Sequence, residues 1–274
     1  MPSTTTPGSA MPENSPAAPV APVARVRRTA AAALAVVATL ALTLTGCGTQ
    51  TVSPASVRGD AGGDGEGRYG SVDCAKAKCI ALTFDAGPGK DTPRLLDILK
   101  EEKVPATFFL LGKNHVLAHP DTVRRIADEG HEVANHTWSH RILTDLDRAG
   151  IRKELSRTQN AIAKITGRKP TLMRPPQGRT NGDVTDISRE LGLSQVLWSA
   201  TAKDYSTTDS DLIERRIVDD ASADGIILLH DIYDGTVPAV PGIIEQLKKR
   251  GYTFVTVPQL FAPAVPKPGE VYRP

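Results

Sequence analysis

Short runs of apolar and β-branched residues alternate with longer amphipathic segments along most of this chain. The first run, 80–85, ends in the lone acid Asp85 and is followed by a Gly-Pro turn signal. This pattern is typical of a buried strand whose last side chain emerges at the edge of a sheet. The next segment, 91–102, is predicted to be a helix, because its leucines form one stripe, Pro93 suits the first turn and Thr92 is a candidate cap.

The same alternation continues almost to the end of the chain. Ligands of such folds bind beyond the carboxyl ends of the strands, where Asp85 would lie, although the acid could equally brace its turn. Seven strands interleaved with helices predict a parallel α/β sheet or barrel in a single domain. Further strands are expected at 106–111, 132–134, 171–173, 194–198, 226–229 and 253–257, and further helices at 120–129, 149–166, 183–191, 209–219 and 240–250.

The first 46 residues have the pattern of a targeting segment. Three arginines at 25–28 precede an uninterrupted run of small apolar residues, 29–45, which matches a secretory signal. The run ends in Leu-Thr-Gly-Cys47, which resembles the bacterial lipobox, so Cys47 is the expected site of lipidation. The alternative is a plain transmembrane anchor, for which the run is somewhat short. The Gly- and Ser-rich segment after it predicts a flexible tether over 47–75.

Composition narrows the remaining choices. The chain has 274 residues, of which 40% are hydrophobic, enough for one large domain. Its net charge of +2 is accounted for by the three Arg and one Glu of the targeting segment, so charge gives no support for nucleic-acid binding. Outside the cytoplasm, Cys74 and Cys79 favour a small disulfide loop over a redox or metal pair, whose usual spacing is closer.

Polar side chains follow several of the predicted strands. His136 and His140 come directly after the strand at 132–134, and at this spacing on one helical turn they would share a face and could hold a metal ion. They could also be surface or capping histidines. Arg174 follows the strand at 171–173 and precedes two prolines that fix the backbone, so its guanidinium could hold a carboxylate or form a surface salt bridge.

His230 closes the apolar run 226–229. A histidine emerging from a buried strand suits a general acid or base, and the competing interpretation is a core histidine bonded to backbone. An acid, a histidine pair, an arginine and a histidine thus recur at the same end of separate strands, which favours one common site.

With these residues in place, the chain resembles the polysaccharide deacetylase family, also known as the NodB-homology domain and the fourth family of carbohydrate esterases. Its motifs occur in the family's order and cover residues 79–261, nearly the whole globular part. They are Thr-Phe-Asp-Ala-Gly-Pro at 83–88, His-Thr-Trp-Ser-His at 136–140, Arg-Pro-Pro at 174–176, the segment 198–205, and Leu-Leu-His-Asp at 228–231.

The resemblance implies a distorted (β/α) barrel that removes N- or O-acetyl groups from a polymeric sugar with the help of a divalent metal, often zinc. It implies that Asp85 is the general base, that His136 and His140 bind the metal, and that Arg174 orients Asp85. It also implies that His230 protonates the leaving group.

Two further residues take roles from the resemblance. The backbone N–H of Gln177 would help to hold the oxyanion, and Asp204 would support the catalytic histidine. The chain departs from the family where Ala86 replaces a metal-binding Asp and Thr201 replaces an Asp that tunes the histidine. Gln177 and Tyr205 also replace a common Tyr and a common Trp.

The domains expected are a lipoprotein signal peptide at 1–46, the tether at 47–75, the deacetylase domain at 76–262 and a C-terminal tail at 263–274. The expected function is that of a metal-dependent deacetylase, and the protein is expected to be a monomer that is lipid-anchored outside the cytoplasm. Peptidoglycan is the favoured substrate, and chitin-like polymers or acetylated xylan are the others. Because of Ala86 and Thr201, a catalytically degenerate glycan-binding lipoprotein is the alternative.

Overall fold

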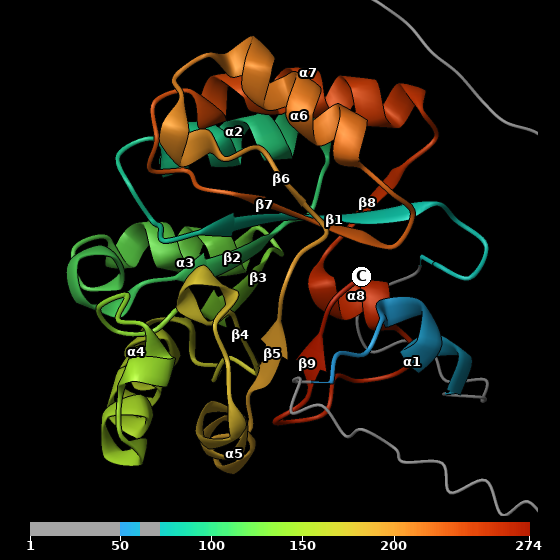
Figure 1. Ribbon diagram of the computed structural model, residues 1–274. Helices are drawn as coiled ribbons and strands as arrows, with labels where there is room; N and C mark the ends of the chain where they lie inside the picture. The colour runs from blue at the N-terminus through green and yellow to red at the C-terminus, as the bar shows by residue number, and fades with distance from the viewer. Residues whose placement is uncertain (1–49, 61–71) are drawn as a thin grey trace, which may run out of the picture. The chain divides into compact units, whose positions relative to one another are not determined.

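The computed structural model describes residues 50–60 and 72–274, and the targeting segment with Cys47 lies outside these residues. The described strands form one sheet in the order β6-β7-β1-β2-β3-β4-β5-β9, and β8 also pairs with β1. All of the pairings between strands are parallel. The sheet curls into the distorted (β/α) barrel that was predicted, with most of its helices on the outer side (Figure 1). The strands are β1 (Cys79–Asp85), β2 (Thr107–Leu110), β3 (Glu132–Asn135), β4 (Leu172–Met173), β5 (Ser194–Val196), β6 (Ala200–Thr201), β7 (Gly225–Leu229), β8 (Thr253–Val255) and β9 (Val271–Tyr272).

The helices lie largely where the apolar stripes predicted them. The helix α7 is the main exception, because it begins at Thr236 and not at residue 240, and contains Pro241. The buried side chains of its first turns, among them Val237 and Val240, pack in the same core cluster as β1, and this packing offsets the missing hydrogen bond of a proline inside a helix. The α-helices are α1 (Pro54–Asp60), α2 (Thr92–Glu102), α3 (Pro120–Asp128), α4 (Arg148–Thr166), α5 (Gly182–Glu190), α6 (Ser210–Asp220), α7 (Thr236–Lys249) and α8 (Val257–Phe261).

Strand β1 organises the interior because all seven of its residues are buried. Alternate side chains of a strand point to opposite faces of the sheet. Ile80, Leu82 and Phe84 therefore join the core cluster under α2, α6 and α7, whereas Cys79 and Ala81 join a second cluster with α8. Thr83 and Asp85 continue this second face, so polar side chains occupy the inside of the sheet near its carboxyl ends.

The predicted tether is wrong for the part that the structure describes. Residues 54–60 form helix α1, and Val52 forms a parallel bridge with Tyr272 of β9. The expected C-terminal tail likewise contributes β9, which pairs with β5. Figure 1 shows α1 beside α8, on the side of the domain where β9 lies. Both termini of the globular part are therefore built into the sheet and its covering helices.

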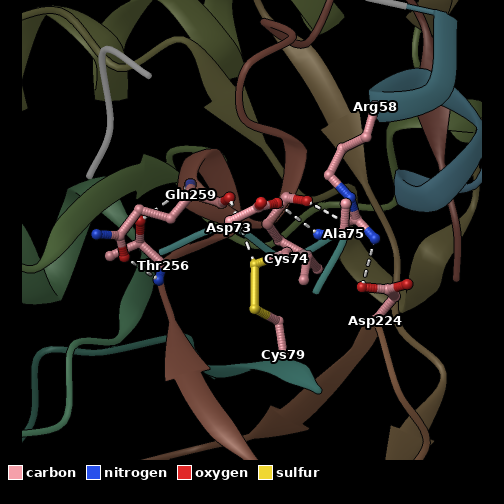
Figure 2. Close-up of a disulfide and its surroundings, with 9 residues drawn as sticks. Arg58, Asp73, Cys74, Ala75, Cys79, Asp224, Thr256 and Gln259 are labelled. Atoms are coloured by element: carbon pink, nitrogen blue, oxygen red, sulfur yellow. Dashed lines mark hydrogen bonds and ion pairs between the residues drawn. A yellow bond between two sulfur atoms is a disulfide. The ribbon is translucent and has the colours of Figure 1, made fainter. Parts of the chain in front are cut away.

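The disulfide predicted between Cys74 and Cys79 is present, and it lies next to the contact that holds α1 (Figure 2). Arg58 of α1 is nearly buried, with its side chain 7% exposed. Its Nη2 lies 2.7 Å from the carboxylate of Asp224, and its Nη1 donates to the carbonyl oxygen of Leu260. Polar contacts thus attach α1 to two separate parts of the domain.

Within residues 50–60 and 72–274, none of the helices is both long enough and apolar enough to cross a bilayer.

The contacts of Arg58 make a testable prediction about stability. Arg58→Ala should lower the free energy of unfolding of the full-length protein by about 2 kcal/mol, because it removes hydrogen bonds of a charged group that is largely withdrawn from water. Lys76→Ala is the matched control, since Lys76 pairs with Asp73 but its side chain is 86% exposed. Urea unfolding measures both, and equal stability of the two variants would show that α1 contributes no more than a tether.

Candidate active site

The carboxyl ends of the strands bring Asp85 and Arg174 together as an ion pair. Asp85 is the last residue of β1, and Arg174 directly follows β4. Arg174 Nη1 donates to Asp85 Oδ1 over 2.7 Å, and both side chains are almost completely buried. The second carboxylate oxygen, Oδ2, is left free of this contact and faces His136, whose Nε2 is 3.9 Å away.

Arg174 is held by several further contacts inside the sheet. Its guanidinium donates to Thr83 Oγ1 and to the backbone oxygens of Val196 and Leu197. Its Cζ also lies 4.1 Å from the centre of the Phe109 ring. Burial lowers the pKa of Arg174, whereas the charge and hydrogen bond of Asp85 raise it. The arginine therefore has one fixed position, from which it orients Asp85.

The two histidines predicted as metal ligands do lie together, but not on a helical turn. Their ring centres are 5.0 Å apart. Residues 136–140 form a loop after β3 in which Thr137 and His140 have positive φ angles of 73° and 59°. The Nδ1 of His136 donates to the carbonyl oxygen of Arg174, which leaves Nε2 as the nitrogen that faces Asp85. Burial lowers the pKa of His136 to about 4, so its imidazole is neutral near pH 7.

Two residues that the sequence interpretation did not single out fix this loop. Glu154 of α4 accepts hydrogen bonds from the backbone N–H groups of Trp138 and Ser139 and from the Ser139 hydroxyl. Asn135 accepts from Thr137 N–H and donates to a backbone oxygen of α4. The available sequence signal for Glu154 was an acid on the apolar face of a predicted helix. Such an acid is expected to be buried and to need hydrogen-bond partners.

The donor set at this place is incomplete for a metal ion. Catalytic zinc sites usually have three protein ligands. Across the part of the chain that the structure describes, no group of three or more His, Cys, Asp or Glu side chains is arranged to hold one. Ala86 has only a methyl group beside Asp85, and its φ of 65° is one that Asn and Asp adopt more readily than other non-glycine residues. His136 and His140 are thus two candidate ligands without the usual third.

His230 is oriented by a carboxylate, as the resemblance implied for Asp204. Its Nδ1 lies 2.8 Å from Asp204 Oδ1, and its backbone N–H donates to Oδ2 of the same residue. The Thr236 hydroxyl also donates to Oδ2. Burial lowers the pKa of His230, but the hydrogen bond and charge of Asp204 outweigh it, so the net pKa is raised. The ring can therefore carry a proton on Nε2.

The rim of the site contains exposed groups that a ligand can reach. Tyr205 is 59% exposed and packs edge-on to His230, which also lies edge-on to Tyr233. Gln177 has a φ of 57°, and among the described residues its backbone N–H donates to no acceptor. That free N–H is where the oxyanion donor was predicted.

Asp231 was quoted in the last motif but given no role, and it supports the turn after Asp85. It is fully buried, and its Oδ2 accepts from Thr92 Oγ1 over 2.5 Å. A Cβ at Gly87 would lie 2.4 Å from Asp231 Oδ1, so only glycine fits there. Thr92, predicted as a helix cap, instead bonds Gly89 and Asp231.

Comparison with known proteins agrees with this geometry. The family model for polysaccharide deacetylase matches residues 73–196. The peptidoglycan-N-acetylglucosamine deacetylase PgdA of Listeria monocytogenes is 38% identical over 185 residues, which are 67% of this chain and 39% of that protein. The chitooligosaccharide deacetylase of Rhizobium leguminosarum bv. trifolii is 39% identical over 195 residues, 66% of this chain and 90% of that protein. The chain belongs to the polysaccharide deacetylase family, and it spans about two fifths of the length of PgdA.

Solved structures give the same fold. The T48 deacetylase with substrate is 43% identical with a TM-score of 0.71, and the match covers 74% of this chain and all of that one. A mutant of BA3943, a CE4 family pseudoenzyme with restored enzymatic activity, is 29% identical with a TM-score of 0.64 and covers 68% of each chain. A deacetylase and a protein derived from a pseudoenzyme of the family therefore share this architecture.

The His230–Asp204 pair generates a prediction about protonation. Asp204→Asn should lower the pKa of His230, because it removes the negative charge that stabilises the imidazolium ion. Thr236→Val is the control, since it removes a hydrogen bond to Asp204 but leaves the charge. NMR titration of the imidazole measures both, and a pKa of His230 that does not fall in Asp204→Asn would contradict the assignment.

Proposed function

We propose that this protein is a deacetylase that hydrolyses acetamido groups of a polysaccharide, with peptidoglycan N-acetyl sugars as the favoured substrate. The observation that carries the proposal is that Asp85, with one carboxylate oxygen free of Arg174, and His230, with Nε2 free of Asp204, lie at the carboxyl ends of neighbouring strands. Two of the relatives are named for peptidoglycan or chitooligosaccharide deacetylation, which supports this substrate class.

Asp85 is the general base in this proposal. Arg174 occupies Oδ1, so Oδ2 is available to take a proton from a water molecule as the water oxygen bonds to the acetyl carbon. The carbonyl oxygen then becomes an oxyanion, and the backbone N–H of Gln177 is the donor available to it. Because Arg174 cannot move within its buried contacts, the attacking water would be held in a fixed direction.

His230 is the general acid. Its Nδ1 is bonded to Asp204, so the proton leaves from Nε2 and bonds to the nitrogen of the departing sugar as the carbon–nitrogen bond breaks. The products are acetate and a free amine. The hydrogen bond and charge of Asp204 raise the pKa of His230, which increases the fraction of the ring in its acid form.

We also propose that a divalent ion, zinc in the first instance, binds His136 and His140 with low affinity. Bound there, it would supply Lewis-acid activation. Burial lowers the pKa of both imidazoles, which favours the neutral form that binds a metal, whereas Ala86 offers no third ligand. The same features leave open a second function, a catalytically degenerate glycan-binding protein, which the incomplete ligand set favours.

We also propose that the protein is exported from the cytoplasm, lipidated at Cys47 and attached to the cell membrane. This proposal rests on the sequence pattern before residue 50. A membrane-attached protein would meet the organism's own wall first, which is a further reason to favour peptidoglycan.

The roles of Asp85 and His230 can be tested by acetate release from N-acetylglucosamine oligomers and peptidoglycan. Asp85→Asn and His230→Gln should each lower kcat/KM by roughly 10²–10⁴, the range for loss of a general base or acid. Asn is used at Asp85 because Ala would leave the buried Arg174 unpaired. Asp97→Asn, an exposed acid on α2, is the control. Undiminished activity in the first two variants would contradict the proposal.

Ala86 provides a separate test of the ion. Ala86→Asp should tighten zinc binding on the order of tenfold or more, because a carboxylate completes the usual three ligands. Ala86→Asn is the matched control, since it suits the same backbone conformation but lacks the charge. Calorimetry with zinc measures affinity, and acetate release shows whether activity follows. If the parent protein neither binds zinc nor releases acetate, and Ala86→Asp restores both, the parent is the catalytically degenerate binder.

A further inference from the structure

A second hollow lies beside the candidate active site and is not used by the acid–base arrangement. It is an open groove of about 610 Å³ between the loop after β4 and the edge strand β9. Thr51, Val271 and Arg273 line one side of it, and Gly178 and Arg179 line the other. The first side comes from the two terminal segments, 50–52 and 271–273, which lie outside the residues that the family model matches. The groove is therefore built partly from the two terminal segments, outside the residues of the family match.

Only a thin wall separates the groove from the reacting groups. The side chain of Leu197 lines the groove, while its carbonyl oxygen accepts from Arg174 Nη2. Gly178 lines the groove next to Gln177, and a Cβ on Gly178 would lie 3.0 Å from the Trp198 ring. Since Gly178 also has a φ of 68°, the loop is held close to Trp198 by the absence of a side chain. The groove therefore lies directly beside the strand end and the loop that carry Arg174 and Gln177.

The charge of the groove has one sign. Its lining contains the two exposed arginines, Arg179 and Arg273, and no Asp or Glu. Neither arginine forms an ion pair or a side-chain hydrogen bond with any other described residue, whereas many surface arginines of this protein, such as Arg148 and Arg152, are paired. Two unpaired guanidinium groups on one groove are suited to bind carboxylates in a forked geometry.

We propose that this groove is a subsite for the carboxylates of the peptide-bearing sugars of peptidoglycan, and that Arg179 and Arg273 bind them. This rests on the proposed deacetylase function and specifies its substrate. A strand of uncharged N-acetyl sugars could occupy the site over Asp85 but would leave both arginines unused. The groove would therefore make the protein prefer a carboxylated wall polymer to chitin-like chains.

The test compares one polymer in two charge states. Peptidoglycan is first freed of phosphate polymers with hydrofluoric acid, and half of it is then amidated at its carboxylates with carbodiimide and ammonia. We expect the full-length protein to have a KM about three- to tenfold lower for the carboxylated form, the range for two partly exposed charge contacts. Salt should reduce this preference.

The variants assign the preference to the groove. In the double variant Arg179→Gln and Arg273→Gln the ratio of the two KM values should fall towards one, while Arg124→Gln, an exposed arginine on α3, should keep the parent ratio. Equal KM values in the parent, or an undiminished preference in the double variant, would overturn the proposal.

A binding measurement tests the groove independently of the proposed deacetylase activity. If the parent releases no acetate from any glycan, the proposed deacetylase function fails. Co-sedimentation with the two forms of peptidoglycan then still decides the groove. Retention of the carboxylated form that depends on both arginines supports it, and equal retention of both forms overturns it.

Discussion

The buried pair of Arg174 and Asp85 is the interaction on which the rest of the site depends. An isolated charge inside a protein is costly, so a guanidinium with no exposed surface requires both an opposite charge and acceptors for its other N–H groups. Thr83 on β1 and the backbone oxygens of Val196 and Leu197 at the end of β5 supply those acceptors. The curvature of the sheet that brings β1, β4 and β5 around one side chain is therefore also what positions the base.

Residues in left-handed backbone conformations surround this pair. Ala86, Thr137, His140 and Gln177 all have positive φ angles without being glycine, and all lie in loops that leave the carboxyl ends of strands. Such conformations cost of order 1–3 kcal/mol each and persist where surrounding contacts impose them. Here those contacts include Asp231 against the turn at Gly87 and Glu154 under the loop at 137–139. Contacts of the surrounding residues thus offset the strain of holding these loops over the site.

The sequence predicted the barrel well because its signals are local. Buried strands appear in the sequence as apolar runs, and helices appear as apolar residues at helical spacing. The polar residue after each run marks the same end of the sheet. The way His136 meets His140 was not predictable from spacing, because it depends on loop angles set by Glu154, eighteen residues further on. The start of α7 was missed because burial of Val237 outweighs the usual rule for proline. Helix α1 was missed because a short helix in a polar segment has no periodicity of its own, and it is stabilised by contacts of Arg58 and Val57 with the rest of the domain.

The docking of residues 50–60 changes how far the domain can travel from whatever precedes it. The eleven residues 61–71 join two described parts of one domain and add nothing to that distance. Between Cys47 and the bridged Val52 there are five peptide steps, which span at most about 18 Å when fully extended. If Cys47 carries a lipid, as proposed, the domain is confined to a thin layer above the bilayer. It would then act on newly made glycan close to the membrane, and older wall further out would lie beyond its reach.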